Sequence, residues 1–120
     1  MSAYNEITID LACPSCARIG QVRAQAHVAA DFDGDHTGRF CGREYRIGER
    51  MAWWHEEDPR HAGWTDPDGG TPSDSVDECC YARCGACASE LFALIHFLNL
   101  RPTAVLSLGL VEDWPPDYPQ

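Results

Sequence analysis

Two pairs of cysteines constrain the fold of this 120-residue chain more than any other feature of its sequence. Cys13 and Cys16 form one C-x-x-C pair, Cys84 and Cys87 form the other, and 67 residues lie between Cys16 and Cys84. Thiolates at this spacing can both face one metal ion, and two such pairs supply the four soft ligands of a structural zinc site. The sequence therefore predicts one structural Zn²⁺ bound by these four cysteines, with a large insertion between the two halves of the site.

The cysteine count and the N-terminus indicate the compartment in which such a site forms. The chain has seven cysteines, an odd number that cannot all pair within one molecule. Its first residues, MSAYNEITID, lack the basic and apolar regions of a secretory signal, so we expect a cytoplasmic protein. Because cytoplasmic thiols stay reduced, the cysteines are expected to be metal ligands or free thiols and not disulfides.

The net charge is strongly acidic and unevenly distributed. Nine arginines and no lysines stand against 19 acidic residues, for a formal charge of −10. This balance argues against nucleic acid as a partner, because phosphate neutralisation needs clustered basic side chains. The sequence also lacks a run of about 18 apolar residues, which a membrane-spanning helix would need, so no membrane association is expected.

Much of the acidity lies in residues 51–78, which carry eight acidic residues and one arginine. The same stretch contains three tryptophans, three prolines and three glycines, a composition that interrupts helices and strands. We therefore interpret 51–78 as an acidic insertion, rich in Trp, Pro and Gly, within a single domain that spans residues 1–120.

Alternation of polar and apolar residues in the N-terminal half predicts a mainly β fold with little helix. Residues 6–11 alternate as a half-buried strand does. Residues 18–28 favour a second strand, although their alanine content also fits a helix. Residues 40–54 combine aromatic and β-branched side chains with two glycines, which predicts a hairpin with its turn near Gly48.

The most apolar part of the chain begins at residue 90, and periodicity alone does not decide between strand and helix there. A helix over 91–98 could be capped by Ser89. The turn signal at 99–102 and the strand pattern that follows favour a β-hairpin. Within this segment, His96 is expected to be a core histidine. The proline-rich residues 112–120 are predicted to form an extended tail.

The two cysteine pairs resemble the knuckles of a zinc ribbon, a fold in which two turns at the ends of β-hairpins clamp one zinc ion. The resemblance implies a small β-rich domain with a structural metal. Ala17 and Ala88 stand where a glycine most often follows the second cysteine of a knuckle. The same sulfurs could hold redox-active iron, as in a rubredoxin-like electron carrier. The resemblance is carried by Cys13, Pro14 and Cys16 in the first turn and by Cys84, Gly85 and Cys87 in the second.

Three cysteines, Cys41, Cys79 and Cys80, lie outside the two pairs. Neighbouring residues on a strand point to opposite faces, so at most one of Cys79 and Cys80 is expected to enter the core. Free cysteines are often buried as small hydrophobic side chains, and we favour that interpretation over a second metal site shared with a histidine.

A zinc ion with four thiolate ligands keeps no open position for a substrate, so this site is not expected to catalyse hydrolysis. We therefore expect a non-catalytic accessory or adaptor protein that binds another protein through the insertion and the arginine-bearing segment before it. Tryptophan is enriched at the centres of such interfaces. The side chains predicted to contact the partner are Trp53, Trp54, Trp64, Arg43 and Arg46.

Two further functions remain open at this point. The acidic insertion could mimic nucleic acid toward a basic partner. A small metalloenzyme or enzyme subunit would instead need acid/base side chains away from the cysteines, in the 55–61 loop. The candidates there are His55, Glu56, Asp58 and His61.

Overall fold

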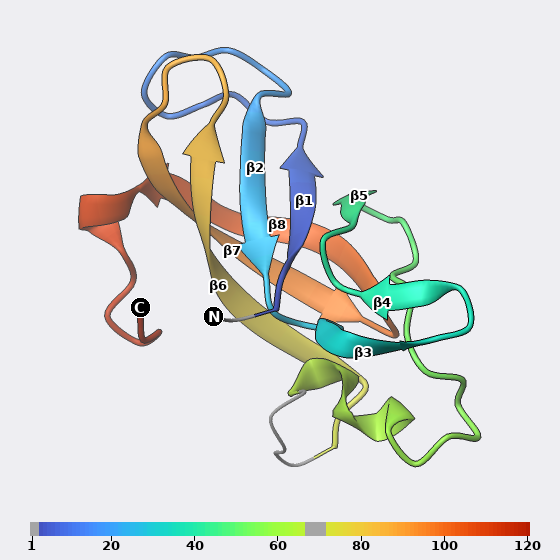
Figure 1. Cartoon of the computed structure of the whole chain (residues 1–120). Helices are drawn as coiled ribbons and strands as arrows, with labels where there is room; N and C mark the ends of the chain where they lie inside the picture. The colour runs from blue at the N-terminus through green and yellow to red at the C-terminus, as the bar shows by residue number, and fades with distance from the viewer. Residues whose placement is uncertain (1–2, 67–71) are drawn as a thin grey trace.

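The computed structural model describes residues 3–66 and 72–120, so residues 67–71 of the predicted insertion lie outside the described residues. It contains a larger and a smaller β-sheet (Figure 1). The smaller sheet pairs β3 (Asp31–Asp35) with β4 (Gly38–Phe40). The larger sheet has, in chain order, β1 (Asn5–Ile9), β2 (Val22–Ala26), β5 (Glu44–Arg46), β6 (Ser75–Cys84), β7 (Glu90–Leu98) and β8 (Arg101–Leu110).

The six strands of the larger sheet lie side by side in the order β5-β1-β2-β6-β7-β8. β1 and β5 run parallel, and all other neighbouring strands in it run antiparallel. Helix in the described residues is confined to two short 3₁₀ turns, η1 (His61–Thr65) and η2 (Val111–Asp113). None of it is long and apolar enough to cross a membrane. The prediction of a mainly β fold is confirmed.

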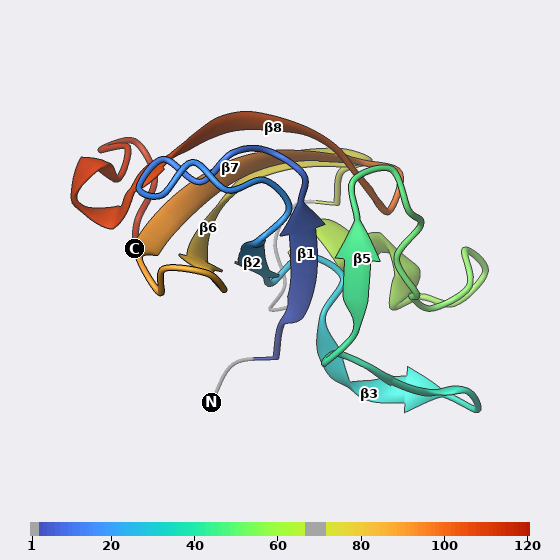
Figure 2. The same ribbon diagram turned by 90° about the horizontal axis from the view of Figure 1, so that it is seen from above.

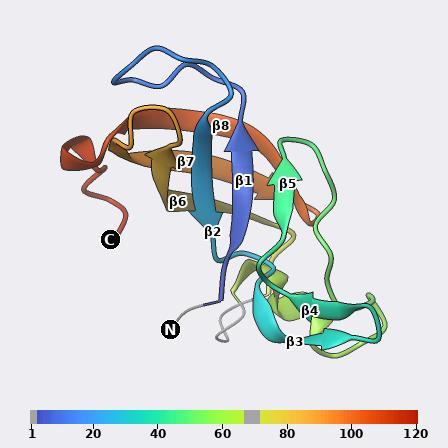
Figure 3. The same cartoon turned by 45° about the horizontal axis from the view of Figure 1, so that its top comes forward.

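The larger sheet curls into a half-barrel, and its concave face holds the core (Figure 2). The polar–apolar alternation of β1 and β2 produces this core, because every second side chain points inward. Ile7 and Ile9 are fully buried, and the small side chains of Ala24 and Ala82 face each other across β2 and β6. The smaller sheet lies away from the β1–β2 loop, toward the opposite end of the molecule (Figure 3).

The two edges of the larger sheet come together where the chain leaves β5. The Gly48 N–H donates to the Pro102 carbonyl at 2.6 Å, and the Met51 N–H donates to the Leu100 carbonyl at 2.8 Å. The Arg101 guanidinium also donates to the Gly48 carbonyl at 3.0 Å. The segment after β5 therefore bonds to the start of β8, so the half-barrel is bridged at this end.

The strands predicted over 6–11 and 18–28 are confirmed as β1 and β2, with Arg18 to Gln21 left in the loop before β2. The predicted 40–54 hairpin is wrong. β4 pairs with β3, and β5 pairs in parallel with β1, where Tyr45 lies opposite Ile7 and faces the core. A turn does form at Gly48, whose φ is 93°, but the chain then runs against β8 and does not return along itself.

The predicted hairpin over residues 90–111 is confirmed as β7 and β8. Its two-residue loop places Asn99 at φ 49° and Leu100 at φ 66°, the left-handed pair that suits the twist of a tight hairpin. The buried side chain of Leu100 anchors this turn in the core. His96 is not a core histidine, which corrects the prediction: it is 35% exposed and its Nδ1 lies 2.6 Å from the Asp77 carboxylate on β6.

The acidic insertion packs against the core in its described part. Trp64 on η1 is 3% exposed, and its carbonyl accepts a hydrogen bond of 2.7 Å from the Ala29 N–H. β6 begins at Ser75, so residues 75–78 of the predicted insertion belong to the larger sheet. One of them, Glu78, accepts hydrogen bonds from the backbone N–H groups of His27 and Val28, which ties β6 to the end of β2.

The C-terminal tail begins with η2 and packs against the larger sheet. The ring of Trp114 lies 6.1 Å from that of Phe92 on β7. The Trp114 indole N–H donates to the Tyr118 carbonyl at 2.8 Å, so residues 114–118 also bond to one another.

The burial of Trp64 makes a testable prediction about the insertion. Trp64→Ala is expected to lower the free energy of unfolding by about 3–5 kcal/mol, because a large buried side chain is lost from the core. Urea denaturation followed by circular dichroism measures this loss. Trp114→Ala is the matched control, since its half-buried indole lies on the tail, and it should cost clearly less. Equal losses in the two variants would contradict the placement of the insertion in the core.

Candidate metal centre

The sheet topology brings the two cysteine pairs to one end of the half-barrel, at the top of Figure 1. The first pair lies in the β1–β2 loop, and the second lies at the end of β6 and in the β6–β7 loop. β2 and β6 are antiparallel neighbours, with Val22 directly opposite Cys84. The start of β2 and the end of β6 are therefore adjacent, which places the two loops together although they are far apart in sequence.

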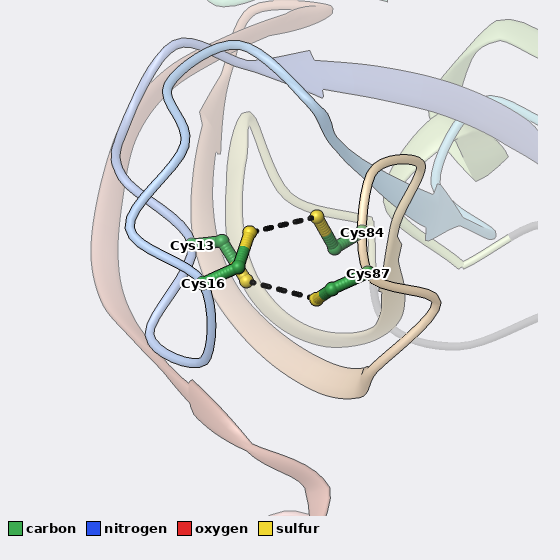
Figure 4. A group of neighbouring side chains, drawn as sticks. All are labelled: Cys13, Cys16, Cys84 and Cys87. Carbon is green, nitrogen blue, oxygen red and sulfur yellow. Dashed lines mark hydrogen bonds between the residues drawn. The ribbon is translucent and has the colours of Figure 1, made fainter.

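All four sulfur atoms lie within 4.8 Å of one another (Figure 4). The Sγ atoms of Cys13 and Cys87 are 3.8 Å apart, and those of Cys16 and Cys84 are 3.7 Å apart. A disulfide would need a separation of about 2.05 Å, and the four cysteines are free thiols. A tetrahedral ion with metal–sulfur bonds of about 2.3 Å would separate its ligands by about 3.8 Å. The cluster therefore has the dimensions of a four-thiolate site for one metal ion.

The two turns that carry the cysteines, which we call the first knuckle (residues 13–18) and the second knuckle (residues 84–89), have equivalent backbone hydrogen bonds. In each, the residue after the second cysteine donates to the carbonyl of the first at 2.9 Å. In each, the N–H of the first cysteine donates to the last carbonyl of the turn, at 2.8 Å in the first knuckle and 3.2 Å in the second. The two C-x-x-C sequences therefore form turns with the same backbone hydrogen bonds.

Backbone amides point at sulfur in both knuckles. The Ser15 N–H lies 3.3 Å from the Cys13 sulfur, and the Ala86 N–H lies 3.4 Å from the Cys84 sulfur. Such donors stabilise the negative charge of a metal-bound thiolate. A further bond of 2.8 Å, from the Gly85 N–H to the Gln21 carbonyl, joins the second knuckle to the loop that follows the first.

Ala17 and Ala88 adopt the left-handed backbone conformation that glycine takes most easily. Their φ angles are 65° and 60°. They occupy the position where the commonest knuckle sequence has glycine, so the substitution by alanine leaves the turn geometry intact and adds backbone strain.

The thiols of Cys87 and Cys16 have different affinities for protons. Hydrogen bonds from the Ser89 hydroxyl and backbone N–H lower the pKa of Cys87 to about 6. A hydrogen bond from the Arg18 N–H lowers the pKa of Cys16, but burial and the neighbouring thiols outweigh it and raise the value to about 11. Ser89 was not among the residues predicted to belong to the site. Its position two residues after a cysteine is the signal that could have identified it.

The other three cysteines lie outside the cluster. Cys80 is buried on the concave face and Cys79, its neighbour on β6, is half-buried on the other face, as the strand geometry predicted. Burial raises the pKa of the Cys80 thiol well above its ordinary value, so this residue behaves as a small apolar side chain. Cys41 is half-buried between β4 and β5.

Four of the five side chains predicted to contact a partner are buried or half-buried. Trp54 and Trp64 are 8% and 3% exposed, and Trp53 is half-buried with its indole N–H donating to the His61 carbonyl at 2.9 Å. Arg46 is exposed on β5, and Arg43 is half-buried, with its Nε donating to the Arg39 carbonyl. Their role in binding stays a prediction, and the structure adds that two of the three indoles expose little surface.

Three of the four acid/base candidates of the 55–61 loop, namely His55, Asp58 and His61, each have a separate local partner. Asp58 forms an ion pair of 2.7 Å with Arg60, whose hydrogen bonds lower the pKa of this carboxyl to about 2. Nδ1 of His61 lies 2.8 Å from the Trp54 carbonyl, and Nδ1 of His55 accepts the Glu57 N–H. His61 and Glu56 line a hollow of about 520 Å³ that His55 and Asp58 do not line.

Comparisons with protein-family models, with curated proteins and with solved structures found no match for this chain. The zinc ribbon therefore remains a resemblance carried by the two knuckles, and the four-cysteine cluster rests on the geometry described above.

The strained alanines yield a prediction about stability. Ala17→Gly and Ala88→Gly are each expected to stabilise the protein by about 0.5–1 kcal/mol, because glycine adopts a positive φ without the clash of a Cβ atom. Thermal unfolding of the metal-loaded protein measures the change. Ala86→Gly serves as the control in the same turn, because Ala86 does not have a positive φ, and it should not stabilise. A loss of stability in both test variants would contradict the assigned knuckle geometry.

Proposed function

We propose that this protein is a non-catalytic adaptor that binds another protein and whose fold is cross-linked by one structural zinc ion. The observation that carries the proposal is the close approach of the four sulfurs of Cys13, Cys16, Cys84 and Cys87, which all lie within 4.8 Å of one another. Four thiolates would fill all four positions of a zinc ion and leave none for a substrate or a reactive water. Such a site holds structure together and does not perform hydrolysis.

The position of the cluster supports a structural role. The metal would join the β1–β2 loop to the β6–β7 loop, two segments of irregular backbone that share one direct backbone bond, from Gly85 to Gln21. Ions that bind a folded site and not the unfolded chain add their binding free energy to folding. The site would therefore fix this end of the half-barrel.

The 55–61 loop gives less support to an enzyme. The four candidate side chains do not converge, since Asp58 is engaged by Arg60 and only Glu56 and His61 share a hollow. Acid/base catalysis needs donor and acceptor groups within hydrogen-bond reach of one reacting atom. The mimicry of nucleic acid is also weakened, because part of the acidity is used internally, in the pairs of Asp77 with His96 and of Asp58 with Arg60.

The metal is tested by elemental analysis of protein purified without added metal. We expect about one zinc per chain in the wild type and none in Cys84→Ser, which should also lose thermal stability because three ligands bind zinc more weakly than four. Cys79→Ser is the matched control: it removes one half-buried cysteine outside the cluster and should keep the zinc. Iron with visible thiolate absorption would support the rubredoxin-like alternative, and a stable, metal-free wild type would refute the proposed site.

The adaptor role is tested by capture of partners from a native lysate. The double variant Arg43→Gln/Arg46→Gln is expected to lose a protein that the wild type retains, because both residues carry cationic side chains predicted to contact the partner. Arg39→Gln/Arg50→Gln changes the net charge equally and should retain it. Absence of any specific partner of the wild type would count against the adaptor role, while identical capture by both variants would count against the predicted contacts.

A further inference from the structure

The convex face of the half-barrel carries three arginines in one line across four strands. Arg46 on β5 lies opposite Thr8 on β1, Thr8 lies opposite Arg23 on β2, and Arg23 lies opposite Arg83 on β6. We call Arg46, Arg23 and Arg83 the arginine row. The row is unexpected in a chain whose net charge is −10 and which has nine basic residues in all.

Arg23 and Arg83 form a like-charge pair at directly opposed positions, an arrangement that destabilises a sheet. Among the described residues, neither forms an ion pair. The acid best placed to neutralise Arg83 is Glu90, opposite it on β7, but the Glu90 carboxylate accepts a hydrogen bond of 3.1 Å from the Tyr81 hydroxyl. Glu90 therefore offsets the repulsion between Arg23 and Arg83 only in part, and an unfavourable contact of this kind is often retained for binding.

The pair lies in a surface hollow of about 360 Å³ beside the second knuckle. Arg23, Gln25, Tyr81 and Arg83 contribute polar side chains to its lining, and Gly85 of the second knuckle borders it. Nη1 of Arg23 donates to the Gly20 carbonyl at 2.9 Å, which fixes the guanidinium and leaves its Nε and Nη2 donors for a ligand. These two donors form the side of a guanidinium that binds a carboxylate in a bidentate manner.

We propose that the arginine row binds carboxylate side chains of an acidic segment in the partner protein, an inference that rests on the adaptor function proposed above. Side chains at directly opposed positions have Cβ atoms about 5 Å apart, so Arg23 and Arg83 can both contact one carboxylate. Arg46 lies two strands from Arg23, at about 10 Å, and receives a second one.

The small extent of the basic surface favours a short acidic peptide over nucleic acid. Glu6 and Glu44 lie opposite each other on β1 and β5, close to the row, and Glu6 lines the hollow itself. A phosphate backbone binds a broad basic surface, which this narrow row with acidic neighbours does not provide. Gln25 and Tyr81 add neutral polar groups that suit one localised carboxylate.

The probe for this site is a hexaglutamate peptide, titrated into the metal-loaded protein at fixed ionic strength and followed by ¹⁵N NMR. We expect saturable shifts of the backbone amides of Arg23, Gln25, Tyr81 and Arg83, and no shifts with hexaglutamine. Arg23→Gln and Arg83→Gln should each weaken hexaglutamate binding about tenfold, as expected for loss of a charge-assisted hydrogen bond. Arg39→Gln, which removes an exposed arginine from the smaller sheet, should bind as the wild type does.

The Tm of each variant separates binding from folding. Arg83→Gln removes both the repulsion with Arg23 and the attraction to Glu90, so its Tm should stay close to that of the wild type while hexaglutamate binding weakens about tenfold. Absence of saturable shifts, equal weakening by Arg39→Gln, or tighter binding of oligothymidylate than of hexaglutamate would each overturn the inference. The adaptor function stands if the wild type captures a partner that Arg23→Gln and Arg83→Gln still retain, so the two proposals can fail separately.

Discussion

The approach of four sulfur atoms at one end of the half-barrel is the constraint on which the rest of the structure depends. Cys13 and Cys16 approach Cys84 and Cys87 because β2 pairs with β6. This pairing places the loop before β2 next to the loop after β6. A metal ion bound by the four cysteines would in turn stabilise the pairing of β2 with β6, because the ion would connect the β1–β2 loop to the β6–β7 loop. The strand pairing and a metal-bound cluster would thus stabilise each other. Each knuckle also contains one alanine in the strained left-handed conformation, which is part of the turn that positions the sulfurs.

The other end of the molecule is held without cysteines. There the segment after β5 bonds to the start of β8, and the insertion contributes Met51 and Trp64 to the core. The chain between β2 and β6 is therefore not an appendage between two halves of a metal site. It supplies a strand of the larger sheet, bridges the sheet edges and covers the end of the core that the knuckles do not reach.

The strands and turns that depend on local sequence patterns could be predicted from the sequence, whereas the pairing of strands that are distant in sequence could not. Strand alternation identified β1 and β2, and the turn at Asn99 identified the β7–β8 hairpin, because these signals lie within the segments themselves. The 40–54 segment also has strand character, but its partner is the free edge of β1, which no pattern near Tyr45 reveals. The four cysteines could be grouped by their chemistry alone. Arg23 and Arg83 could not, since they become neighbours only through the pairing of β2 with β6.

On the proposed function, the metal centre and the arginine row act as one unit. The Arg23 guanidinium is held by the carbonyl of Gly20, and the next residue, Gln21, accepts the backbone bond from Gly85 of the second knuckle. Ordering of the knuckles by a metal therefore orders the backbone that positions Arg23. A cation held in place loses less entropy on binding than a free side chain does. A structural metal ion without a catalytic role would thus still contribute to partner binding, because it would order the backbone that positions Arg23.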